Sequence, residues 1–192
     1  MAHQIYSTGA FVLGSYESGE ASRMVDVLTR DFGRVRALAR GVREERSKLR
    51  FALLSGDEVT LSLVKGRNIW RIVGAEDPQA LPEEKEDRTF FLRVLRLSRL
   101  LLQGEEANHA YYDTLHECRA LLKTPLTTSD REIAEVVVVL KLLHALGYVS
   151  DEAALRGALA TSILDTSALR AFAGARKEAI EAINTALRES GL

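Results

Sequence analysis

An alternating row of arginines and small apolar residues occupies residues 33–41 of this 192-residue chain. In a β-strand successive side chains point to opposite faces, so Arg34, Arg36, Leu38 and Arg40 would share one face. The residues between them are small and apolar, and they can pack into a core. Guanidinium groups two residues apart on a strand are about 7 Å apart, a spacing that suits neighbouring phosphates of an extended polyanion. The pattern therefore predicts an anion-binding face.

Positive charge continues beyond this strand. From Arg34 to Arg50 there are seven positive and two negative residues, whereas the net charge of the whole chain is −1. A second cluster lies on a predicted hairpin at 65–71. Local charge of this kind favours a polyanionic partner, with affinity from phosphate contacts and base stacking. The candidate nucleic-acid contacts are Arg34, Arg36, Arg40, Arg43, Arg46, Lys48, Arg50, Lys65, Arg67, Trp70 and Arg71.

Each part of this set has a plainer alternative. The basic segment could be a solvated strand and loop of mixed charge, with Glu44 and Glu45 pairing locally. Trp70 is the best base-stacking candidate, but in a strand it shares a face with Ile72, which favours a place in the core. Arg71 would then lie on the opposite face.

The first 75 residues predict five strands joined mostly by short turns. The expected strands cover residues 5–15, 22–30, 34–40, 59–63 and 69–74. Closure into a small barrel would remove their exposed edges. Pro78 and Pro82 end this β region, because two prolines so close together break regular pairing.

Helical periodicity follows the prolines. The expected helices cover residues 83–102, 105–123, 129–146, a short segment opening at 150–152, and 175–188. Ser129 and Glu132 have the spacing of a capping box, and Gly147 is a natural helix stop. The fold class is therefore α+β, with a β domain at 1–78 and an all-α domain at 83–192. A single domain sharing one core is the alternative.

Signals for catalysis, metals or cofactors are weak. There is no glycine-rich phosphate loop, and the four histidines are scattered. Cys118, the single cysteine, excludes an internal disulfide or a cysteine-based zinc cluster and is expected to be a buried small hydrophobe. The helical arginines form either a solvated face or a basic groove for an acidic peptide; they are Arg88, Arg93, Arg96 and Arg99. No signal peptide or membrane span is visible, so we expect a cytoplasmic protein.

Segments of the β region resemble a known family in order and spacing. They are residues 6–15, 19–23, 28–43, 47–50 and 74–76, with scattered matches at 146–148 and 183–190. The sequence resembles bacterial DNA repair proteins of the RecO family. That resemblance implies an N-terminal five-stranded OB-fold barrel followed by a helical domain. It also implies a DNA-binding surface on the basic face of the barrel, which falls here on Arg34, Arg36, Arg40 and the loop to Arg50.

The resemblance further implies a role without catalysis in recombination and repair. Such proteins bind single- and double-stranded DNA, anneal complementary strands, and help to load RecA, together with RecR, onto DNA coated by single-strand-binding protein. Many members carry a four-cysteine zinc module after the Leu-Gly-Tyr turn, and residues 149–166 here have no cysteine. Two other functions stay open: an adaptor acting mainly through its helices, and an RNA-binding OB-fold protein.

Overall fold

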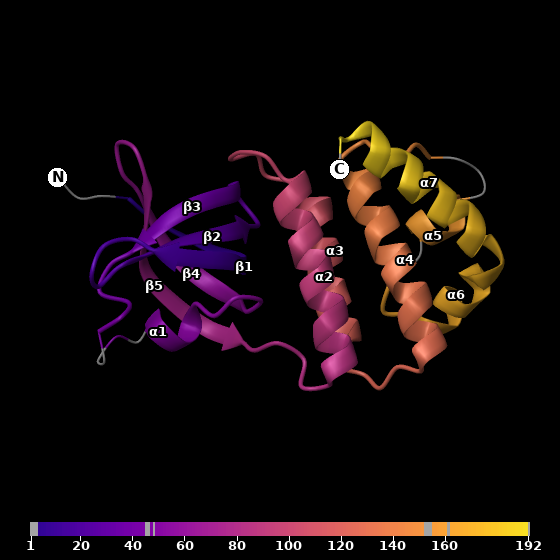
Figure 1. The fold of residues 1–192 in the computed structure, drawn as a ribbon, viewed down its shortest axis with the longest axis horizontal. Coiled ribbons are helices and arrows are strands. Elements are labelled where there is room, and N and C mark those ends of the chain that lie inside the picture. The colour runs from indigo at the N-terminus through magenta and orange to yellow at the C-terminus, as the bar shows by residue number, and fades with distance from the viewer. Residues whose placement is uncertain (1–3, 45–46, 48, 152–154, 161, 192) are drawn as a thin grey trace. The chain divides into compact units, whose positions relative to one another are not determined.

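The computed structural model describes residues 4–44, 47, 49–151, 155–160 and 162–191. Its first part is a five-stranded β-barrel in which the strands follow the order β1-β2-β3-β5-β4 and β1 pairs with β4 to close the ring (Figure 1). All pairings are antiparallel except that of β3 with β5. The strands are β1 (Ile5–Glu17), β2 (Arg23–Thr29), β3 (Gly33–Ala39), β4 (Glu58–Lys65) and β5 (Trp70–Gln79).

The barrel interior is built by the alternation that the sequence shows. Val35, Ala37 and Ala39 on β3 are 1%, 0% and 0% exposed and belong to one apolar cluster with residues from the other four strands. A one-turn helix, α1 (Leu49–Ala52), lies between β3 and β4 and contacts β5. The sequence pattern did not predict this helix, because four residues are too few to show a helical period.

Helices form the rest of the chain. They are α2 (Lys85–Leu101), α3 (His109–Leu121), α4 (Thr128–Ala145), α5 (Arg156–Ala160), α6 (Thr166–Ala171), the 3₁₀ turn η1 (Phe172–Ala175) and α7 (Arg176–Glu189). The central place expected for the helix at 129–146 is confirmed, since α4 contacts α3, α5, α6 and α7. Cys118 on α3 is fully buried, as predicted. The predicted α+β fold, a five-stranded OB-fold barrel followed by helices, is thus confirmed.

The chain divides into two compact units, which we describe separately. The barrel unit comprises Met1–Leu81 and Leu95–Asn108, and the helical unit comprises Pro82–Val94 and His109–Leu192. The first crossing between the units lies between Leu81 and Pro82, and the division into domains at 1–78 and 83–192 stays a prediction. The later crossings had no signal in the sequence, because α2 is one continuous amphipathic helix whose last turns belong to the barrel unit.

Two helix starts differ from their predictions. The N-cap of α4 is Thr127, not Ser129: the Thr127 Oγ1 accepts a hydrogen bond from the Asp130 N–H at 3.1 Å and donates one to Asp130 Oδ2 at 2.8 Å. The expected short helix at 150–152 is also wrong for its described residues, since α5 begins at Arg156; Glu152 lies outside the described residues. The stop at Gly147 is confirmed, with φ at +78° where glycine avoids strain.

Asp130 also joins α4 to α6 within the helical unit. Its Oδ1 and Oδ2 accept hydrogen bonds of 2.7 and 2.8 Å from Arg170 Nε and Nη2. The bonds from Arg170 and from Thr127 favour the charged carboxylate, so they hold the pKa of Asp130 below its usual range. The same carboxylate therefore takes part in the N-terminal cap of α4 and in the contact between α4 and α6.

We predict that Asp130→Asn lowers the urea midpoint of the full chain at pH 7, because it removes the charge that Arg170 binds. A carboxylate whose pKa is lower in the folded state stabilises the fold above its unfolded pKa, about 3.9. The difference from wild type should therefore be constant from neutral pH to about 5 and shrink below about pH 4. Circular dichroism during urea titration at several pH values measures it.

Glu181→Gln is the matched control, since Glu181 lies 4.0 Å from Lys177 in an exposed pair that contributes little. A difference for Asp130→Asn that stays constant below pH 4 would contradict the assigned role of the carboxylate charge.

Candidate nucleic-acid interface

β3 presents its arginines to the outside of the barrel. Arg34 is half-buried, Arg36 is exposed, and Arg40 is exposed immediately after the strand ends. The facing predicted from the alternation is therefore confirmed. The three guanidinium groups nevertheless have different surroundings, and these decide which of them can meet a phosphate.

Arg34 is held by a carboxylate of the neighbouring strand. Its Nε donates to Asp26 Oδ1 at 2.9 Å and its Nη2 to Asp26 Oδ2 at 2.7 Å, a two-point pairing. Asp26 is 5% exposed, and it lies on the outward side of β2 between Val25 and Val27 of the core. Hydrogen bonding to Asp26 raises the pKa of Arg34 above its usual value. This guanidinium is therefore occupied.

The remaining donor of Arg34 binds the end of α2. Its Nη1 donates to the carbonyl oxygens of Arg99 and Leu102 at 2.7 and 2.9 Å. The last carbonyls of a helix lack partners within the helix, and a cation there also complements the helix dipole. Arg34 thus acts as a C-terminal cap supplied by the barrel.

The chain after α2 packs closely on the start of β3. The Arg34 N–H donates to the Gly104 carbonyl at 3.2 Å. Gly33 has a φ of +68°, and a Cβ at this position would lie 2.2 Å from the Glu106 carbonyl oxygen. Any side chain at residue 33 would therefore displace this connection.

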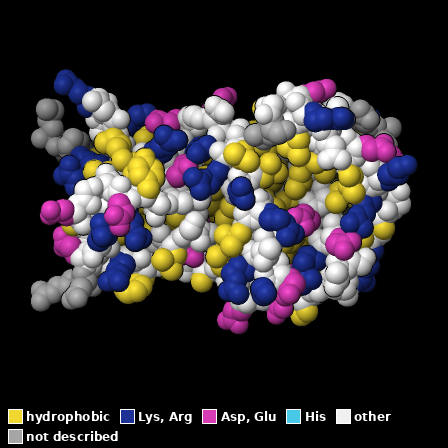
Figure 2. Space-filling view, in the orientation of Figure 1, with side chains coloured by type: hydrophobic (Ala, Val, Ile, Leu, Met, Phe, Trp, Pro, Cys, Tyr) yellow, Lys and Arg dark blue, Asp and Glu magenta, His cyan; other side chains and the backbone are white. Residues whose placement is uncertain are grey.

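A shallow hollow of about 580 Å³ opens beside these contacts within the barrel unit. Arg34, Arg36, Arg99 and Glu105 contribute its charged lining, and Arg99 Nε lies 3.8 Å from Asp26 Oδ2. The three arginines outnumber the two carboxylates, which are Glu105 in the lining and Asp26 beside it, so the net charge at the hollow is positive. Figure 2 shows one face of the molecule, on which Lys and Arg side chains lie among fewer Asp and Glu over the barrel.

Two of the predicted contacts on the hairpin at 65–71 make contacts within the barrel unit. Trp70 is 3% exposed and packs with Tyr6 and Phe32, its ring centroid 5.8 and 5.1 Å from theirs. Lys65 Nζ lies 5.0 Å from the Trp70 ring and 3.0 Å from Glu105 Oε2. The structure therefore favours the core alternative for Trp70, because a ring so buried offers no face to a base.

The other predicted contacts fall into three groups. Arg43 pairs with Glu17 at 3.3 Å, with both side chains well exposed. Arg46 and Lys48 lie outside the described residues. The third group consists of cations that form no ion pair with any carboxylate the structure describes: Arg36, Arg40, Arg50, Arg67 and Arg71.

Two residues near this surface were not among the predicted contacts. Arg99 was treated with the other helical arginines, because the sequence does not show that the end of α2 joins the barrel unit. Phe51 on α1 is 69% exposed, beside Arg50. The sequence feature that could have indicated Phe51 as a contact is its position directly after the basic segment that ends at Arg50.

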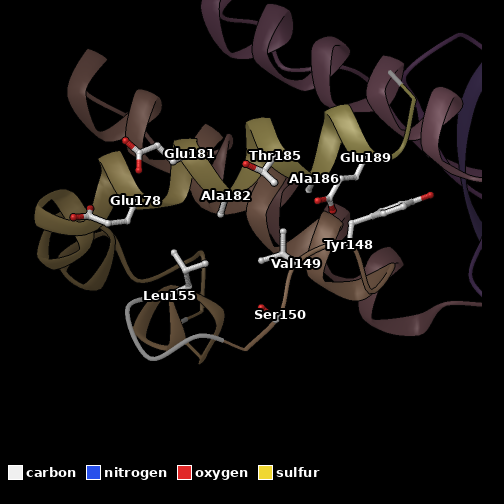
Figure 3. Close-up of a pocket in the computed structure, with 10 residues that line it drawn as sticks. All are labelled: Tyr148, Val149, Ser150, Leu155, Glu178, Glu181, Ala182, Thr185, Ala186 and Glu189. Atoms are coloured by element: carbon white, nitrogen blue, oxygen red, sulfur yellow. The ribbon is translucent and has the colours of Figure 1, made fainter.

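A second hollow, in the helical unit, has the opposite charge. Glu178, Glu181 and Glu189 of α7 line it over an apolar floor that includes Val149 and Leu155, and its volume is about 440 Å³ (Figure 3). Carboxylates repel phosphate. A polyanion is therefore better matched by the barrel surface than by this hollow.

Comparison with known proteins agrees with the fold. Residues 1–79 match the family model for the N-terminal domain of recombination protein O. The chain is 31% identical over 153 residues to the DNA repair protein RecO of Cutibacterium acnes, covering 76% of this chain and 62% of that protein. It is 30% identical over 148 residues to the DNA repair protein RecO of Dechloromonas aromatica, covering 76% and 60%.

The chain belongs to the RecO family. A third relative, the DNA repair protein RecO of a Nocardioides species, is 44% identical over 72 residues, which cover 38% of this chain and 30% of the relative. The chain thus spans about three fifths of the length of the first of these RecO proteins.

The residues of this RecO-family chain do not fit the four-cysteine zinc module expected of many relatives. Cys118 is the single cysteine, and burial raises the pKa of its thiol, which disfavours the thiolate that zinc needs. Within the described ranges, no group of three His, Cys, Asp or Glu side chains is placed to hold a metal ion.

The helices described there are also too short or too polar to cross a membrane.

We predict that Arg34→Gln destabilises the barrel by about 2–4 kcal/mol, because it leaves Asp26 buried without its partner. Arg36→Gln should change the free energy of unfolding by no more than about 0.5 kcal/mol, as expected for an exposed side chain. Trp70, the single tryptophan, lies in the barrel core and reports unfolding by its fluorescence during denaturant titration. Equal stabilities of the two variants would contradict the structural role of Arg34.

Proposed function

We propose that this chain is a DNA-binding recombination and repair protein that grips the phosphates of single-stranded DNA on the outer surface of its barrel. The observation that carries the proposal is the set of five cations that no described carboxylate neutralises. Membership of a family whose named members are DNA repair proteins supports it. The proposed role needs no catalytic group.

The contacts would begin on β3 and continue onto its neighbour. Arg36 lines the positive hollow, and Arg40 follows at the end of β3. Arg71 lies on β5 beside β3, where it is the register partner of Leu38. Arg67 on the preceding turn extends this surface. Arg34 is left out, because its donors already bind Asp26 and the end of α2.

Such contacts read charge, not base sequence. Each neutralised phosphate releases a counterion, so about five contacts to single-stranded DNA correspond to a log–log salt slope of roughly −3.5. Two strands held on one cationic surface also repel each other less, which would favour annealing of complementary strands. Double-stranded DNA has the same phosphates and is a proposed partner as well.

The proposed partners follow from the family. We propose that the chain assists RecA loading together with RecR on DNA coated by single-strand-binding protein. The helical unit is the candidate surface for those protein contacts, because its acidic hollow is unsuited to DNA.

We predict that changing Arg36, Arg40 and Arg71 together to Gln weakens binding of single-stranded DNA and reduces the magnitude of the salt slope by about 2, since three phosphate contacts are lost. Fluorescence anisotropy of a labelled oligonucleotide at several salt concentrations measures both quantities. The matched control changes Arg156, Lys177 and Arg188 of the helical unit to Gln, which removes the same charge from exposed positions. It should leave the slope unchanged.

Equal effects of the two triple variants would show that net charge, not the barrel surface, determines binding. Competition between matched DNA and RNA oligonucleotides separates the proposed DNA function from RNA binding, and a clear preference for RNA would overturn it.

A further inference from the structure

We propose that Phe51 is a stacking platform for an unpaired base of single-stranded nucleic acid. This inference rests on the proposed function and adds a residue and a type of contact to it. A single exposed apolar side chain needs no explanation by itself. Three features of Phe51 together point to a planar ligand in a polyanion.

The first feature is a fixed, outward ring. Three residues anchor α1 and its end: Leu49 packs against the barrel core, Ala52 is 5% exposed, and Leu53, which follows the helix, is 3% exposed in that core. The helical turn therefore directs the Phe51 side chain away from the barrel, and the side chain is 69% exposed. A ring held on an anchored turn loses little further freedom when a base stacks on it.

The second feature is the guanidinium beside the ring. Arg50 Cζ lies 5.7 Å from the Phe51 ring centroid, within the range of a cation–π contact. No described carboxylate pairs with Arg50, so its charge stays available to a phosphate. A base on the ring and its phosphate at Arg50 would be held by adjacent side chains.

The third feature is continuity with the basic surface. Main-chain hydrogen bonds run from Glu44 N to Gly41 O, from Ser47 N to Glu44 O and from Arg50 N to Ser47 O. These hydrogen bonds join described residues between the end of β3 and α1. α1 also contacts β5, the strand that carries Arg71, so the ring lies on an element packed against a strand that supplies one of the proposed phosphate contacts.

These features favour a nucleic-acid base over an apolar protein segment. An apolar protein partner would have to bury the charge of Arg50, which no described carboxylate pairs, and that is costly. Extended single strands satisfy both requirements, because each nucleotide supplies one flat π-face and one phosphate. Stacking on aromatic side chains accepts any base, in keeping with binding that reads no sequence.

The test compares the full chain with Phe51→Ala, Phe51→Trp and Leu54→Ala by anisotropy of labelled oligo(dT) and of an abasic oligonucleotide of equal length. Phe51→Ala should weaken oligo(dT) binding by about fivefold or more and leave abasic binding and the salt slope unchanged. Phe51→Trp should retain oligo(dT) affinity. Leu54→Ala is the matched control, since Leu54 is 50% exposed on the same segment but has no π-face.

Unchanged oligo(dT) affinity in Phe51→Ala would overturn the platform while leaving the phosphate-binding function intact. Equal losses for the oligo(dT) and abasic probes, with an altered thermal melt, would make the role of the ring structural and also overturn it. A change in oligomeric state, measured by sedimentation, would instead make Phe51 a protein contact. Absence of salt-dependent binding to either probe by the wild-type chain would overturn both proposals.

Discussion

The paired carboxylate of Asp26 organises the outer surface of the barrel. A carboxylate that is 5% exposed is stable only when it is fully paired, and Arg34 supplies both of the close hydrogen bonds. The rest of the same guanidinium binds the last carbonyls of α2. One ion pair therefore fixes the end of α2 on the barrel, and with it the position of Arg99 and the shape of the hollow that contains Arg36.

This constraint divides residues that look equivalent in the sequence. Arg34, Arg36 and Arg40 share one face, yet binding a phosphate at Arg34 would require breaking hydrogen bonds to a buried charge. Arg36 and Arg40 have no such cost. A charge count thus overstates the cations available to DNA, and the useful quantity is the number that no carboxylate already binds.

The strands and their facing could be predicted because alternation along one strand is a local property. The partner of Arg34 could not, since Asp26 comes into reach only through the register of β2 with β3. The α4 cap shows the same limit. Ser129 and Glu132 have suitable spacing, but Thr127 is the cap, and the residue it caps, Asp130, also binds Arg170, which lies 40 positions later and which spacing does not reveal. Phe51 lay in a segment too short for any period to indicate its direction.

The two proposed kinds of contact differ in a way that bears on annealing. Phosphate contacts weaken as salt rises and are available to single and double strands, so they do not require an unpaired base. A base on Phe51 must be unpaired, and its stacking is little affected by salt. When complementary strands pair, that base returns to the duplex and the ring loses its ligand. The ring would therefore add affinity for separate strands that the duplex they form does not receive, which favours release of the annealed product.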